Sequence, residues 1–375
     1  AGVVAFLGWQ RYVPPPPEEL PGVTPAADLL WQAIQQRKRL AVWGDVDVDG
    51  QTATTLLVDA LRELGAQPLY VIPHRLNDGH GIKLPTLEKL LAQGVDLLLT
   101  CDTGVAEHEA IALARARGVQ VIVTDHHDLP PDLPRVEALV EPKLLARAHP
   151  LRELPGVGVA FILMQALYSR AGRPGAEARL LDLVALGIVA DVARQVGDTR
   201  YLLQRGLLQL RQSPRLGLQA LMAQANLDPL RVDAETIGFQ LGPRLNALGR
   251  LAAGTQAVDL LTTTDATTAR ILAAHLEGIM NGTFLVVAGF VWNELRISAG
   301  LRKTVFWTLL YGTFVNWLFT LLSAILGTSR MTPISGAGYS GTELNENLVS
   351  AGLVTVALTM VFSLAVIIYG LRGKV

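Results

Sequence analysis

The first 274 residues of this 375-residue chain predict an α/β fold in which helices flank a parallel sheet, and the remainder predicts an all-α membrane segment of two to three helices. In the first part, short apolar runs bounded by turn residues alternate with longer stretches of helical period, which is typical of α/β proteins. These short runs are continuously apolar, as expected of strands that are covered by helices on both faces. Near the carboxyl end, two uncharged runs are long enough to cross a bilayer.

Composition changes near residue 275, and this change sets the boundary that we expect between two domains, 1–274 and 275–375. The second part contains 10 of the 65 charged side chains, 12 of the 22 aromatic side chains and a single proline, Pro333. A formal net charge of −1 argues against a globally basic, nucleic-acid-binding surface. The one cysteine, Cys101, excludes an internal disulfide framework and a Cys-rich zinc site.

Four strands and four helices are expected after the proline-rich stretch Pro14–Pro17. The apolar runs predict the strands Leu40–Val46, Pro68–Pro73, Asp96–Cys101 and Val119–Thr124. The stretches of helical period predict the helices Ala26–Gln36, Thr52–Leu64, Leu84–Ala92 and Glu107–Ala116. In parallel sheets of this kind, ligands bind outside the carboxyl ends of the strands, so the residues after each run are the ones to examine.

Acidic or imidazole side chains follow several of the apolar runs. GDVDVDG follows the first run, CDTG the third and TDHH the fourth, and the later run LGIVADV closes on an aspartate. The side chains delivered in this way are Asp45, Asp47, Asp49, Asp102, Asp125, His126, His127 and Asp191. So many carboxylates cannot all stay ionised at one edge unless a cation neutralises them. The sequence therefore predicts a divalent metal site there.

The ligand types restrict the choice of metal. Carboxylates with one or two histidines and no thiolate suit Mn²⁺ or Mg²⁺ better than a structural zinc ion. At least five candidate ligands are enough for two ions about 3.5–4 Å apart, the arrangement that hydrolyses phosphodiesters. The alternative for any single aspartate, such as Asp49 or Asp191, is that it only caps a helix.

These motifs resemble the DHH phosphoesterase family, and within it the RecJ-type exonucleases, which degrade single-stranded DNA in the 5′ to 3′ direction. Six segments carry the resemblance, in the family's order: Val42–Leu57, Leu98–Val105, Val123–Pro130, Leu154–Phe161, Leu183–Val192 and Gly238–Leu251. The resemblance implies metal ligation by Asp47, Asp49, Asp102, His126 and Asp191. Asp45 and His127 either join this catalytic group as ligands or orient the residues that do.

Four residues are expected to contact the substrate: His80, Arg244, Asn246 and Arg250. Guanidinium groups suit bidentate phosphate recognition. His80 lies between two glycines, and a plain turn residue is the alternative for it. The glycines of Gly156–Gly158 either cradle a phosphate at a helix start or allow close helix packing. The resemblance implies single-stranded DNA or short oligonucleotides as partners, and a cytoplasmic location.

The chain is expected to be an incomplete nuclease of this type. Its opening, AGVVAFLGW, lacks the basic flank and the cleavage site of a signal peptide, so we expect a truncated start. The pattern Val258–Ala274 follows the family into its connecting helix and then stops. The family's smaller substrate-binding domain and its oligonucleotide-binding barrel do not follow, and we expect impaired action on DNA.

Two uncharged runs in the second part, Thr304–Leu326 and Asn347–Leu371, contain 23 and 25 residues. As helices they extend about 35 Å or more, against a hydrocarbon core of about 30 Å. A third uncharged stretch, Gly278–Asn293, has 16 residues and is of borderline length. The prediction is two to three membrane spans with the lipid bilayer as partner, and buried core helices of a soluble domain are the alternative.

Basic side chains flank the runs in two places. Arg296, Arg302 and Lys303 lie between Gly278–Asn293 and Thr304–Leu326, and Arg372 and Lys374 follow Asn347–Leu371. By the positive-inside rule, these flanks are expected to face the cytoplasm. If all three runs span the membrane, residues 1–274 emerge on the opposite side. A cytoplasmic nuclease and three spans of this charge pattern are then inconsistent with each other.

The second part resembles the hydroxylaminobenzene mutase and styrene-oxide isomerase family of membrane isomerases. The segments concerned are Ala274–Phe290, Phe306–Ile334 and Gly336–Ser350. That family has four spans, and this chain resembles the last three. The resemblance implies haem ligation by His275 and substrate contact by Asn281. Tyr311 and Asn316 are further polar groups inside an apolar run, where polar side chains are functional candidates.

A junction of two unrelated partial genes near Ala274–His275 is the expected origin of this arrangement, by natural fusion, assembly error or a mispredicted reading frame. The expected function is metal-dependent phosphodiester hydrolysis. Two alternatives remain: a membrane isomerase that carries an inert nuclease remnant, and an inactive chimaeric fragment.

Overall fold

The computed structural model describes residues 8–74, 79–251, 254–333, 336 and 338–372. The chain forms two compact units. The first unit comprises Ala1–Pro214 with Pro229–Thr262, and the second comprises Arg215–Asp228 with Thr263–Val375. The domain boundary predicted from composition, between residues 274 and 275, falls inside one continuous helix, α13 (Ala266–Phe290).

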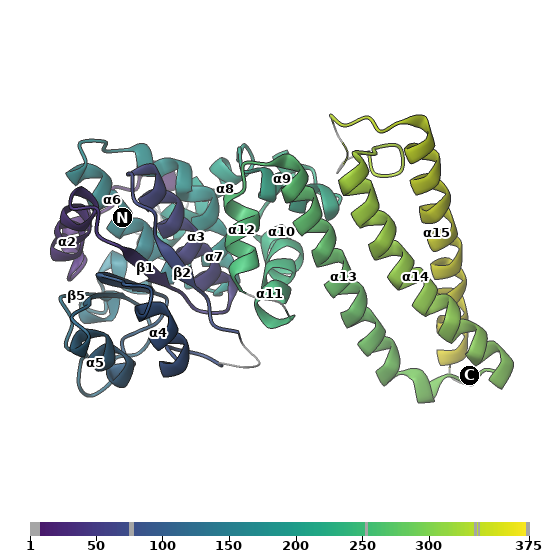
Figure 1. Cartoon of the computed structure of the whole chain (residues 1–375), viewed down its shortest axis with the longest axis horizontal. Coiled ribbons are helices and arrows are strands. Elements are labelled where there is room, and N and C mark those ends of the chain that lie inside the picture. The colour runs from purple at the N-terminus through teal and green to yellow at the C-terminus, as the bar shows by residue number, and fades with distance from the viewer. Residues whose placement is uncertain (1–7, 75–78, 252–253, 334–335, 337, 373–375) are drawn as a thin grey trace. The chain divides into compact units, whose positions relative to one another are not determined.

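A five-stranded parallel sheet with the strand order β2-β1-β3-β4-β5 forms the centre of the first unit (Figure 1). Its strands are β1 (Leu40–Trp43), β2 (Leu69–Val71), β3 (Leu97–Cys101), β4 (Gln120–Thr124) and β5 (Ala138–Val140). The first four lie within the predicted runs and are slightly shorter. The fifth was not predicted, because three apolar residues are too few to stand out as a strand.

Helices cover both faces of the sheet, as its continuously apolar strands require. On one face, α2 (Val23–Gln35), α3 (Val48–Glu63) and α6 (Gly156–Arg170) pack against one another. The other face is covered by α4 (Leu84–Leu91) and α5 (His108–Ala116) (Figure 1). The predicted α/β class, with a parallel sheet and flanking helices, is confirmed.

The strands supply alternate residues to the core under α4 and α5. Ala41 and Trp43 of β1, Leu98 of β3, and Val121 and Val123 of β4 are all buried in this cluster. This spacing of two residues is the period of a strand, whose successive side chains point to opposite faces.

The strand order brings the ends of β1 and β3 together. The chain leaves β1 for β2 on one side of it, and later enters β3 on the other side. Asp45, after β1, and Asp102, after β3, therefore follow adjacent strands at the point where the direction of winding reverses. Open α/β sheets bind their ligands at such a point.

The remainder of the first unit is mainly helical. Its elements include α7 (Leu181–Ala190), α8 (Gly197–Leu210), the short α10 (Ala234–Thr236), the π-helical turn η7 (Ile237–Leu241), α11 (Gly242–Leu251) and α12 (Thr255–Thr262). α7 packs against α3 and α6. The apolar run LGIVADV thus ends a helix, and Asp191 is the residue that caps the carboxyl end of α7.

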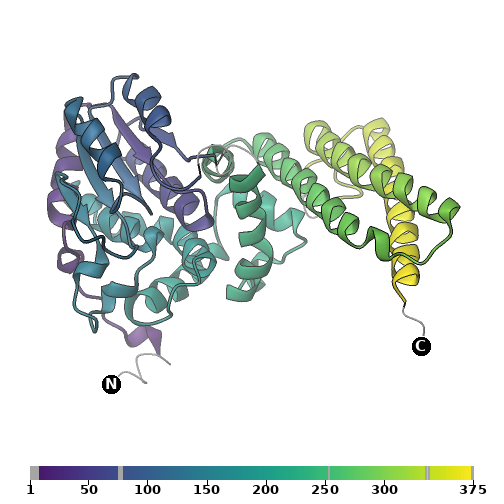
Figure 2. The same cartoon turned by 90° about the horizontal axis from the view of Figure 1, so that it is seen from below.

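The second unit consists of α9 (Leu216–Gln224), α13, α14 (Ala299–Leu326) and α15 (Glu343–Leu371). α13 packs against both α9 and α14, and α14 packs against α15 (Figure 2). Each long helix begins at a side chain that accepts a hydrogen bond from an amide of the first turn, and these caps are Asp265, Ser298 and Thr342.

Glycines allow the long helices to approach closely. A Cβ atom on Gly312 would lie 2.4 Å from the sulfur of Met360, and one on Gly352 would lie 2.4 Å from the ring of Phe319. Small residues at helix contacts are typical of packing within membranes. By length and composition, α13, α14 and α15 could each cross a membrane, which confirms the prediction of two to three such helices.

Candidate metal centre

The loop after β1 places three aspartates around the first turn of α3. Asp47 caps this helix, and its carboxylate accepts a hydrogen bond from the amide of Gly50 at 3.0 Å. A side chain at position 50 is excluded, because its Cβ atom would lie 2.5 Å from the carbonyl oxygen of Asp45. Asp45 is 8% exposed and Asp49 is 1% exposed. The turn therefore buries two carboxylates beside the capping one.

The start of α6 holds the Asp49 carboxylate. Oδ2 accepts a hydrogen bond from the amide of Gly156 at 2.6 Å, and Oδ1 accepts one from the amide of Val157 at 2.8 Å. The amino end of a helix stabilises negative charge, which offsets part of the cost of burying this group. This helix start, considered above as a phosphate cradle, thus binds a carboxylate of the chain itself.

Asp102 follows β3 in a left-handed conformation, with a φ of 59°, and is 2% exposed. Gly156 leaves room for it, because a Cβ atom there would lie 2.6 Å from Asp102 Oδ1. Nε2 of His126 lies 3.0 Å from Asp102 Oδ1 and 3.7 Å from Asp49 Oδ2. The imidazole therefore lies between carboxylates from two distant segments of the chain.

Asp125 orients the loop after β4. Its buried carboxylate accepts hydrogen bonds from the amides of Val105, His126 and His127, and it bonds Nδ1 of the His127 ring at 2.7 Å. Burial by itself would raise the pKa of Asp125, but the bonds from His127 and the amides hold it below its usual value. The same side-chain bond raises the pKa of His127 to about 9.

Three overlapping sets of side chains each place their ligand atoms within 4.8 Å of one another. The sets are Asp102, His126 and His127; Asp49, His126 and Asp191; and Asp45, Asp47 and Asp102. The structure thus brings together all six side chains predicted as ligands, and His127 with them. Because Asp102 and His126 each belong to two sets, the arrangement suits two neighbouring ions.

The electrostatics of these carboxylates fit a bound cation. Burial, together with neighbouring carboxylates, raises the pKa of Asp45, Asp49, Asp102 and Asp191. Oδ1 of Asp45 is buried and makes no hydrogen bond within the described residues, and Oδ1 of Asp102 faces Nε2 of His126 at 3.0 Å. A divalent cation would satisfy these acceptors and keep the carboxylates ionised. Carboxylate and imidazole donors without thiolate suit Mn²⁺ or Mg²⁺.

One of the predicted substrate-binding residues lies beside the metal centre. Nδ1 of His80 is 3.4 Å from Oδ2 of Asp45, and the side chain of His80 is 62% exposed. His80 therefore sits at the solvent side of the carboxylates.

The other three predicted substrate-binding residues belong to α11. Arg244 donates from Nη1 to the carbonyl of Gln240 at 2.9 Å. Oδ1 of Asn246 is buried and makes no hydrogen bond in the part of the chain that the structure describes. The side chain of Arg250 lies outside the described residues. Arg244 and Asn246 are thus placed on one helix, outside the three sets of possible ligands.

Glu141 is a buried carboxylate at the same edge of the sheet that sequence analysis missed. It follows β5, and its Oε1 accepts a hydrogen bond from the amide of Lys143 at 2.9 Å. Burial raises the pKa of Glu141 to about 8, and its Oε2 makes no hydrogen bond within the described residues. The sequence does contain a signal for Glu141, because this carboxylate directly follows the apolar run Ala138–Val140. The run is too short to stand out as a strand.

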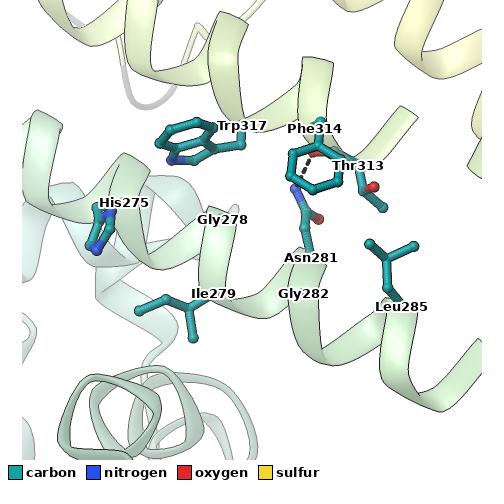
Figure 3. Close-up of a pocket in the computed structure, with 9 residues that line it drawn as sticks. All are labelled: His275, Gly278, Ile279, Asn281, Gly282, Leu285, Thr313, Phe314 and Trp317. Atoms are coloured by element: carbon teal, nitrogen blue, oxygen red, sulfur yellow. Dashed lines mark hydrogen bonds between the residues drawn. The ribbon is translucent and has the colours of Figure 1, made fainter. Parts of the chain in front are cut away.

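The second unit contains a separate cavity of about 190 Å³ between α13 and α14. Figure 3 shows His275, Asn281, Thr313 and Trp317 among the residues around it. Asn281 donates from Nδ2 to the carbonyl of Thr313 at 3.1 Å (Figure 3). Two of the four predicted isomerase residues, His275 and Asn281, therefore line one cavity.

The other two predicted isomerase residues point elsewhere. The hydroxyl of Tyr311 lies 2.9 Å from Oγ1 of Thr355 on α15. Asn316 donates from Nδ2 to Oε1 of Glu277 at 3.1 Å, and Oε2 of Glu277 accepts a hydrogen bond from Gln224 at 3.3 Å. Neither Tyr311 nor Asn316 lines the cavity.

Known proteins resemble both parts of the chain. Residues 39–188 match the model of the DHH family, N-terminal domain. The single-stranded-DNA-specific exonuclease RecJ of Dickeya dadantii is 39% identical over 297 residues, which cover 76% of this chain and 52% of the relative. A crystal structure of exonuclease RecJ bound to manganese aligns with a TM-score of 0.67 and 33% identity, covering 79% of this chain and 78% of that one. Similar RecJ structures are bound to Mn²⁺ or Mg²⁺.

The carboxyl-terminal part has different relatives. Residues 241–372 match the styrene oxide isomerase family model, a match that begins before the predicted junction. The hydroxylaminobenzene mutase HabB of Ectopseudomonas oleovorans is 41% identical over 103 residues, which cover 27% of this chain and 63% of the relative. The chain spans about half the length of the RecJ relatives that it matches. It belongs to the DHH family as a RecJ-like member, and its carboxyl-terminal part is similar to the styrene oxide isomerases.

Proposed function

We propose that the first unit hydrolyses phosphodiester bonds with two divalent metal ions and acts as a 5′ to 3′ exonuclease on single-stranded DNA. The observation that carries this proposal is the convergence of carboxylates and imidazoles after β1, β3, β4 and α7 in three overlapping ligand sets. The names of the RecJ relatives support the substrate, and the family resemblance supports the direction.

Backbone amides hold two of the carboxylates that would bind the ions. Asp49 is immobilised by two amides at the start of α6, and Asp47 by the amide of Gly50. When bound, two such ions supply a water that is nucleophilic at neutral pH and neutralise charge on the phosphate. Ligands that the backbone holds in place lose less free energy when a metal site is assembled.

His127 and His80 act on the substrate side in this proposal. The side chain of His127 is 57% exposed, and its bond to Asp125 raises its pKa to about 9. Its ring, oriented by the bond to Asp125, is placed to contact a non-bridging phosphate oxygen. His80, beside Asp45, offers a second imidazole at the same rim.

Nucleotide release from 5′-phosphorylated single-stranded DNA tests the proposal. In Mn²⁺, the detergent-solubilised full chain should release 5′ nucleotides, and Asp102→Ala should lower kcat/KM by about 10³-fold or more because it removes an oxygen shared by two ligand sets. Asp132→Ala removes an exposed carboxylate outside those sets and should leave the rate unchanged. Release that survives both Asp102→Ala and chelation by EDTA would overturn the proposal.

A second candidate function, isomerisation of a small aryl substrate, is favoured by the cavity that His275 and Asn281 line. Its volume of about 190 Å³ lies below the roughly 300–1,000 Å³ of pockets that enclose drug-sized ligands. A single aryl ring with one small polar group fits this volume. Membranes that contain the chain should convert hydroxylaminobenzene to aminophenol, or an aryl epoxide to an aldehyde. His275→Ala should abolish the conversion, and Tyr311→Phe, away from the cavity, should not.

A further inference from the structure

Phe239 presents an unusually exposed aromatic ring for the first unit. It is 79% exposed, and no other phenylalanine, tyrosine or tryptophan among the described residues of this unit is exposed. Its neighbours in the chain on either side, Ile237 and Leu241, are buried. The segment is therefore anchored while Phe239 faces solvent.

The ring belongs to a segment that packs against the end of α7. A Cβ atom on Gly238 would lie 3.6 Å from Cγ1 of Val189, and one on Gly242 would lie 3.9 Å from Cβ of Ala190. The next residue along α7 is Asp191, a member of one of the three ligand sets. Phe239 is thus carried on a turn that lies alongside the last turn before a candidate metal ligand.

The backbone on both sides of this contact departs from regular structure. Phe239 lies in a π-helical turn, a form that is rare and often found at functional sites. Val192, directly after Asp191, has a φ of 57° and is 86% exposed. A β-branched residue in this left-handed region is strained, and such strain persists where the surrounding structure fixes it.

A cationic side chain follows Phe239 on the same helical segment. Arg244 folds back along the helix and donates to the carbonyl of Gln240, the residue after Phe239. An aromatic ring and a guanidinium group are the two kinds of side chain that bind a nucleotide, through its base and its phosphate.

We propose that Phe239 is a stacking platform for a nucleobase of the single-stranded nucleic acid whose phosphodiester is held at the carboxylates. This inference rests on the proposed nuclease function. Every base has a π face, so stacking on Phe239 binds the strand with little sequence preference. Phe239 then acts as a positioning residue for the nucleotide, and the chemistry stays with the metal centre.

Oligonucleotide binding tests the proposal without hydrolysis. In EDTA, a single-stranded oligonucleotide should quench the added tryptophan of the Phe239→Trp full chain, relative to the parent chain. The same sugar–phosphate strand without bases should quench it far less, because stacking needs a base. Equal quenching by the two strands would overturn the proposal.

Steady-state kinetics of DNA hydrolysis provide a second test. In Mn²⁺, Phe239→Ala should raise KM for single-stranded DNA about 10- to 100-fold and leave kcat nearly unchanged, since one stacked base is lost. Phe239→Trp should behave like the parent chain, and Leu208→Ala, which truncates an exposed apolar residue on α8, should have no effect. An unchanged KM in Phe239→Ala overturns the proposal. Phe239 would then be a residue that contacts another protein and not the nucleic acid. Absence of hydrolysis by the parent chain counts against the nuclease function, while quenching in EDTA still decides the role of Phe239.

Discussion

Among single residues, two buried carboxylates of the first unit show how hydrogen bonds decide the effect of burial. Asp125 and Asp198 are both 1% exposed. Asp125 has an imidazole and three amides as partners, and its pKa falls. Asp198 accepts one hydrogen bond from the hydroxyl of Tyr12 at 2.6 Å, and burial raises its pKa to about 6. Asp125 thus stays ionised and holds its loop in place, whereas Asp198 titrates near pH 6.

Asp198 predicts a pH dependence of stability. Its pKa in the folded chain, about 6, lies above the value of 3.8 of an unperturbed group, so the folded state binds the proton more tightly. Stability is therefore highest below the unperturbed pKa and falls by up to about 3 kcal/mol as the pH rises through 6. Asp198→Asn should remove this fall, and the midpoint of urea unfolding between pH 4 and pH 7 measures it. Asp132→Asn, at an exposed position, should keep the slope of the parent chain, and a slope unchanged in Asp198→Asn would contradict the prediction.

Among the elements, the start of α6 links the two halves of the metal centre. Its first amides hold Asp49, and the missing side chain of Gly156 leaves the space that Asp102 occupies. The glycines of Gly156–Gly158 stand out in the sequence, but their partner does not. The partner lies more than a hundred residues away in the chain, and no local pattern encodes it.

Gly156→Ala tests this role of α6. Its Cβ atom would meet Asp102 Cβ at 2.6 Å, so the carboxylate must move. We expect Mn²⁺ affinity to fall about 10- to 100-fold, as when other groups that orient metal ligands are lost, with the helical content unchanged. Gly158→Ala is the control, because its Cβ atom faces Leu154 and Pro155 and not the carboxylates. Titration followed by electron paramagnetic resonance of free Mn²⁺ measures both, and equal affinities would contradict the prediction.

In the molecule as a whole, a nuclease-like unit precedes three helices of membrane-spanning length. The positive-inside rule, applied to Arg296, Arg302 and Lys303, predicts that the segment between α13 and α14 faces the cytoplasm. Three spans then put the segment between α14 and α15, and the first unit with it, on the other side. This conflict with a DNA substrate is a question of topology, which can be measured directly.

Cysteine labelling in intact cells decides the topology. Ser298 and Ser340 are exposed and lie in the two different segments between the long helices. The charge rule predicts that Ser340→Cys reacts with an impermeant maleimide, whereas Ser298→Cys reacts only after the membrane is opened. The parent chain should not react, because its Cys101 is buried. The reverse pattern would place the first unit in the cytoplasm, where a single-stranded DNA substrate is available.

The sequence by itself determined the α/β class, four of the five strands, two long apolar helices with a third of borderline length, and the identity of the acidic and imidazole side chains. These features follow from hydrophobic periodicity and from apolar runs, which are local patterns in the sequence. Only the tertiary structure decided which of these side chains meet. It added Glu141, bound Asp49 to α6, separated Tyr311 and Asn316 from the cavity and placed Phe239 beside the end of α7. The physical reason is that such contacts join segments far apart in the chain, and strand order and helix packing bring them together.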